Sequence, residues 1–90
     1  MQASQVPSHE VIDTLCREFP EADPQWWHQT LTRWRVVLGI KQPERGWYDK
    51  EDLIGLIALG TAYRRHKLQG QRAKDYALSV VHNWKRTHGY

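Results

Sequence analysis

Residues 23–48 have the sequence DPQWWHQTLTRWRVVLGIKQPERGWY, which predicts a helix followed by a short turn-rich segment. Asp23 is a favourable N-cap residue, because its carboxylate can accept hydrogen bonds from the free amides of the first helical turn. Pro24 suits the first helical position, where an N–H group would have no partner. Gly39 can take the left-handed conformation in which many helices end. These signals predict a helix over residues 24–38.

The predicted helix has two faces of different chemistry. Apolar side chains recur at steps of three and four residues, which indicates a buried stripe at Trp27, Thr30, Leu31, Trp34, Val37 and Leu38. The opposite face carries hydrogen-bonding and cationic side chains without a carboxylate: Gln25, His28, Gln29, Thr32 and Arg33, with Arg35 at its flank. This composition suits the base edges and phosphates of nucleic acid.

The rest of the chain predicts a single small domain built from four helices. A flexible N-terminus over residues 1–7 precedes a helix over 8–19, with Ser8 as its N-cap. A third helix begins after Asp49 and carries the most apolar run of the chain, so we expect it to be the centre of the core. A fourth helix over 71–87 follows Gly70. The expected fold class is therefore all-α, with one domain over residues 8–90.

Two features of the segment around the second helix allow alternatives. Residues 40–48 predict a short β-hairpin, because Pro43 and Gly46 are turn residues between apolar positions, although an irregular loop is nearly as consistent. Tyr48 either anchors this hairpin or contacts a phosphate. Trp26 lies about 100° around the helix from Trp27, so the two indoles cannot share one core. Trp26 either packs against the first helix or the hairpin, or contacts a partner.

Charge is unevenly distributed along the chain. The net charge is +3, but residues 1–40 carry three arginines against five acids, whereas residues 41–90 carry ten Lys and Arg against five acids. The basic half includes a cluster at the end of the third helix, formed by Arg64, Arg65 and Lys67. Such asymmetry favours phosphate binding, although solvated basic faces and helix dipoles account for similar clusters.

The sequence gives no indication of an enzyme, a metal or a cofactor. The histidines lack the spacing of metal ligands, the acids at the start of the third helix are explained by capping, and no glycine-rich phosphate loop is present. The single cysteine, Cys16, excludes an internal disulfide. No apolar run approaches the roughly 20 residues of a membrane helix, and we expect a cytoplasmic protein.

The segment from Thr30 to Leu53 resembles the DNA-binding domain of the MerR family and related excisionase-type winged helices. Thr30-Leu31-x-x-Trp34 followed by Leu38-Gly39-Ile40 is similar to the end of that family's recognition helix. Residues 45–53, RGWYDKEDL, resemble its wing-to-helix junction. The family pattern has an arginine two places after the threonine, where this chain has Thr32. The likeness covers about residues 8–80.

The resemblance implies a winged helix-turn-helix protein that places residues 24–38 in the major groove of double-stranded DNA and the wing, 41–48, along the backbone. Lys41 and Arg45 would then reach phosphates from the wing. We expect a transcriptional regulator, a repressor or an architectural factor, that dimerises through its C-terminal helix with Tyr76, Val80 and Trp84. We expect no small-molecule effector.

A second resemblance points to a different class of function. Tyr76-Ala77-x-x-Val80-Val81-x-x-Trp84-Lys85-Arg86 is similar to the C-terminal motif of DnaD-type replication proteins. The alternative function is a DnaD-like replication or phage-type adaptor that acts through protein–protein contacts. As a hypothesis from another class, such an adaptor would not bind DNA directly.

Overall fold

The computed structural model describes residues 5–40 and 47–87. The elements in chain order are β1 (Gln5–Pro7), α1 (Ser8–Glu18), α2 (Pro24–Leu38), β2 (Trp47–Asp49), α3 (Lys50–Arg64) and α4 (Gly70–Thr87). The described part of the chain is therefore mostly helical, with one small antiparallel sheet of two strands.

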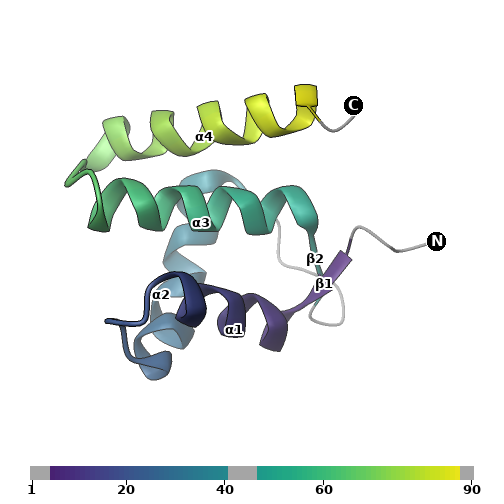
Figure 1. Ribbon diagram of the computed structural model, residues 1–90, viewed down its shortest axis with the longest axis vertical. Coiled ribbons are helices and arrows are strands. Elements are labelled where there is room, and N and C mark those ends of the chain that lie inside the picture. The colour runs from purple at the N-terminus through teal and green to yellow at the C-terminus, as the bar shows by residue number, and fades with distance from the viewer. Residues whose placement is uncertain (1–4, 41–46, 88–90) are drawn as a thin grey trace.

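The central helix of the arrangement is α3. Figure 1 shows α4 running alongside α3 on one side, while α1 lies on the opposite side and α2 passes behind. The first and last helices therefore cover opposite sides of the third. Ala73 and Ala77 are fully buried, and their small side chains let α4 pack closely against α3.

The core lies between α1, α2 and α3. Each helix contributes residues at three- and four-residue steps, as its apolar stripe predicts. In α1 these are Val11, Ile12 and Leu15, followed by Phe19 just beyond the helix. The largest side chains that are almost completely removed from solvent are Trp27, Phe19, Leu15, Leu56, Leu59 and Val11.

Local signals at the ends of α2 are confirmed, whereas that at the start of α1 is wrong. The Asp23 carboxylate accepts a hydrogen bond of 2.8 Å from the Gln25 amide, and Gly39 ends the helix with φ of 71°. In α1 the N-cap residue is Pro7, and Ser8 is already helical. Strand β1 runs directly into α1, so the extended conformation that an N-cap needs falls on Pro7.

The described sheet includes a strand that the sequence did not predict. β2 pairs with β1, in the register Gln5 to Asp49, Val6 to Tyr48 and Pro7 to Trp47. Residues 5–7 are consequently a strand, which corrects the expectation that they are flexible. The pairing places Val6 opposite Tyr48, which is 4% exposed, so the strand covers one end of the core. The turn residues 43–46 lie outside the described residues.

The start of α3 meets the end of α4. Asp49 is the N-cap residue of α3, as expected, but its side chain makes no capping hydrogen bond. The carboxylate of Glu51 pairs with the Lys85 ammonium at 2.6 Å, which joins the two helices at this end. Burial raises the pKa of Asp52, and the charges of Asp49 and Glu51 raise it further.

Candidate functional site

The outward face of α2 is the surface that the sequence predicts for nucleic acid. The buried stripe of α2, at Trp27, Thr30, Leu31 and Trp34, fixes the helix against the core and turns the other side to solvent. The residues predicted for that side are all exposed: Gln25, His28, Gln29, Thr32 and Arg33. No acidic residue occurs within the helix. This face therefore presents hydrogen-bond donors, acceptors and one cation, which are the groups that read base edges in a DNA groove.

Val36 extends this face, and the sequence analysis missed it. Its side chain is 77% exposed, the largest exposed fraction among the large apolar residues that the structure describes. Val36 lies four residues after Thr32, so helical spacing alone would have placed it on the same face. An exposed aliphatic group among polar side chains can contact a thymine methyl group or an apolar patch on a protein.

Two of the predicted contact residues are partly or largely withdrawn from solvent. Tyr48, in β2, is 4% exposed and belongs to the core, which disfavours the phosphate-contact alternative for this residue. Arg35 is only half-buried, and its Nε is buried without a hydrogen-bond partner among the described residues. Burial raises the pKa of the Tyr48 hydroxyl, although the positive charge of Arg35 opposes this rise.

Arg64 and Arg65 have a structural role that the sequence did not reveal. Both guanidinium groups pair with the Glu21 carboxylate, at 3.4 Å from Arg64 and 3.2 Å from Arg65. Arg65 also donates to the main-chain carbonyl of Glu18 at 3.1 Å. The pKa of Glu21 is lowered, first by a main-chain hydrogen bond and then by Arg65. The basic end of α3 therefore holds the turn between α1 and α2.

Of the remaining cations predicted to contact phosphates, one lies in the described part of the chain and two do not. Lys67 is exposed just after α3, with φ of 57°. Lys41 and Arg45 of the expected wing lie outside the described residues. The charge excess in the second half of the chain is thus partly neutralised by Glu21 of the first half, which pairs with both arginines at the end of α3.

Trp26 packs against the end of α3, a partner that the sequence analysis did not consider. The Arg64 guanidinium lies over its ring, 4.6 Å from the ring centroid. Its ring meets those of Trp27 and Trp34 edge to face, at centroid distances of 4.7 and 5.9 Å. Trp26 nevertheless remains 36% exposed, so it forms part of the surface as well as of an aromatic cluster.

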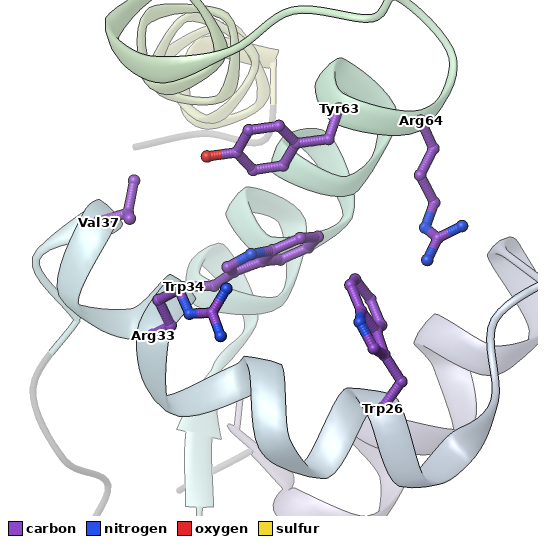
Figure 2. Close-up of a pocket in the computed structure, with 6 residues that line it drawn as sticks. All are labelled: Trp26, Arg33, Trp34, Val37, Tyr63 and Arg64. Carbon is purple, nitrogen blue, oxygen red and sulfur yellow. The ribbon is translucent and has the colours of Figure 1, made fainter.

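This cluster borders a groove between α2 and α3. Figure 2 shows its lining, which consists of Trp26, Arg33, Trp34, Val37, Tyr63 and Arg64. The groove has a volume of about 340 Å³, at the lower end of the range for ligand sites. The sequence could not predict it, because Tyr63 and Arg64 come from a different helix and join the α2 residues only through folding.

Other kinds of site are not evident in the described chain. Across residues 5–40 and 47–87, no group of three or more His, Cys, Asp or Glu side chains is placed to hold a metal ion. Within the same residues, no helix combines the length and apolar composition that crossing a bilayer requires. Comparisons with family models, with curated proteins and with solved structures give no match to this chain.

Proposed function

We propose that the chain is a sequence-specific regulator that binds double-stranded DNA through the outward face of α2. The observation that supports this proposal is the exposed, acid-free row from Gln25 to Arg33 on a helix whose other side is fixed in the core. A helix of this kind has the diameter and the donors needed to enter the major groove. The MerR-like character of the domain, including the wing, remains part of this proposal.

In this account, base reading and backbone binding are assigned to different residues. Arg33, with Gln25, Gln29 and Thr32, would contact base edges, while Lys41, Arg45 and Lys67 would contact phosphates. Arg64 and Arg65 contribute mainly through the position of the turn that they hold, because Glu21 already pairs with both. Phosphate contacts supply affinity without sequence information, and contacts to base edges supply the preference.

A dimer on two half-sites would give such a small module useful specificity. Helix α4 is the proposed dimer surface, but its residues are not equally available. Tyr76 and Val80 are partly buried against the core, whereas Leu78 is 43% exposed. Leu78 is therefore the more accessible apolar contact for a second copy, and the regulator we propose is a repressor that binds as a homodimer.

Replacing Arg33 with alanine should relax sequence preference, because an arginine that is bidentate to guanine supplies about 1–3 kcal/mol of discrimination. Replacing Arg45 with alanine should instead weaken binding to all duplexes by a similar factor. Fluorescence anisotropy with a preferred and a scrambled duplex measures both effects. Arg17→Ala, an exposed arginine of α1, is the control for loss of one positive charge. If Arg33→Ala and Arg45→Ala affect both duplexes equally, Arg33 does not read bases.

The aromatic groove favours a second candidate function, a replication or phage-type adaptor. Trp, Tyr and Arg are the residues that most often dominate protein–protein binding energy, and the groove combines all three types. An adaptor of this class would use the surface around Trp26 without binding DNA. Binding of duplex DNA at low salt distinguishes the two functions, since only the regulator must show it.

A further inference from the structure

The groove between α2 and α3 combines an apolar interior with cations at its rim. Figure 2 shows Arg33 and Val37 on one side, Trp26 and Arg64 on the other, and Trp34 with Tyr63 between them. No carboxylate is among the lining residues. A ligand that fits this site must therefore offer an apolar group for the interior and negative charge for the rim.

Arg64 stays partly accessible at the rim although it pairs with Glu21. Its side chain is 26% exposed, and its Nη1 donates to Glu21 at 3.4 Å, which is a long contact that a ligand carboxylate can share. Stacking over Trp26 holds the guanidinium in place at the groove edge. A guanidinium held in this way loses little conformational entropy when it binds a carboxylate.

The rings in the groove leave little open face for a nucleobase. The Arg64 guanidinium lies over the ring of Trp26. Trp34 is 5% exposed and packs against Tyr63, with ring centroids 5.4 Å apart. Stacking of single-stranded nucleic acid needs exposed ring faces, whereas an aliphatic or aromatic side chain can contact ring edges. The geometry therefore favours a peptide over a nucleotide.

We propose that this groove binds an acidic segment of a partner protein, with one apolar side chain of that segment inserted between Trp26 and Val37 and neighbouring carboxylates paired with Arg33 and Arg64. The charge of the rim selects an acidic partner, and the ring edges select an apolar side chain. This site goes beyond the proposed function, because it requires no DNA. It shares Arg33 with the DNA-binding face, so the two ligands would compete.

A display library of random short peptides, selected against the intact protein without DNA, tests this proposal. We expect the enriched peptides to carry a large aliphatic or aromatic residue next to Asp or Glu. The best peptide, made synthetically with a fluorescent label, then serves as the probe for anisotropy. No enrichment, or enrichment of sequences without acids, would overturn the proposal.

Two variants with the same change in net charge locate the peptide. Arg33→Gln removes the rim cation, and Gln29→Glu adds an acid on the same exposed helix outside the groove lining. We expect about a tenfold loss of affinity from Arg33→Gln, as for a charge-assisted hydrogen bond, and less than about half of that factor from Gln29→Glu. Equal losses would place the peptide elsewhere on α2 and contradict the proposal.

Trp26→Ala is the test of the apolar contact. Because Trp26 is 36% exposed, the variant should fold, and circular dichroism checks this. We expect at least about a tenfold loss of peptide affinity, typical of an aromatic that dominates an interface. A single-stranded oligonucleotide that displaces the labelled peptide and loses binding in the same variant would reassign the groove to nucleic acid. Duplex DNA is absent throughout, so failure here leaves the proposed function untouched.

Discussion

Replacing Trp27 with alanine should lower the free energy of unfolding by about 3–5 kcal/mol, the usual cost of deleting a buried tryptophan. Trp27 is 0% exposed and packs against Phe19 and Trp34 at ring-centroid distances of 5.7 and 5.3 Å. The deletion would leave a cavity where α1, α2 and the end of α3 meet. Because small domains have total stabilities of about 5–15 kcal/mol, this variant should be partly unfolded under mild conditions.

Urea denaturation followed by circular dichroism measures this loss. Trp26→Ala is the matched control, because it deletes the same side chain one position along the helix, where 36% of it is exposed. We expect a clearly smaller loss of stability from the control. Equal losses in the two variants would mean that the core is not organised around Trp27.

Replacing Gly60 with alanine should be the second most damaging change. A Cβ atom at Gly60 would lie 2.8 Å from the Cε2 and Cζ atoms of the Phe19 ring. Phe19 is 2% exposed, so its ring has little room to move. Overpacking of this kind costs about 1–3 kcal/mol, against a gain of up to about 1 kcal/mol from the better helix propensity of alanine. We expect a net loss of stability.

Gly55→Ala provides the comparison within the same helix. A Cβ atom there would meet Val81 at 3.3 Å and Leu38 at 3.4 Å, both of which are side-chain methyl groups of half-buried residues. The same gain in helix propensity applies, so the variant should be close to neutral in thermal unfolding. A greater loss at Gly55 than at Gly60 would contradict the close approach of α3 to Phe19.

Local signals predicted those parts of the fold that depend on neighbouring residues. Asp23, Pro24 and Gly39 define the ends of α2, because capping and left-handed termination need only a few adjacent positions. Helical spacing also placed five polar residues of α2 on its exposed side: Gln25, His28, Gln29, Thr32 and Arg33. The pairing of β2 with β1 was not predicted, because the two strands are separated in the chain by two helices and no local signal links them.

In the candidate site, too, one part was predicted from local sequence and another part depends on the tertiary fold. The outward face of α2 follows from helical period, but the groove requires α3 to bring Tyr63 and Arg64 beside Trp26. The ion pairs of Arg64 and Arg65 with Glu21 were equally hidden, since they join residues from distant parts of the chain. A cluster of cations in a sequence indicates charge, but only the fold reveals which cations already have acidic partners.

The most direct test of the proposed function is fluorescence anisotropy of a labelled duplex from the region upstream of the gene, titrated with the protein at low and at moderate salt beside a scrambled duplex. We predict binding to both duplexes at low salt, and binding that survives moderate salt only on the upstream duplex, because base contacts add to phosphate contacts there. Equal binding to both duplexes that is lost at moderate salt would mean that the protein binds DNA only nonspecifically, through its basic surface. No binding at either salt would contradict it.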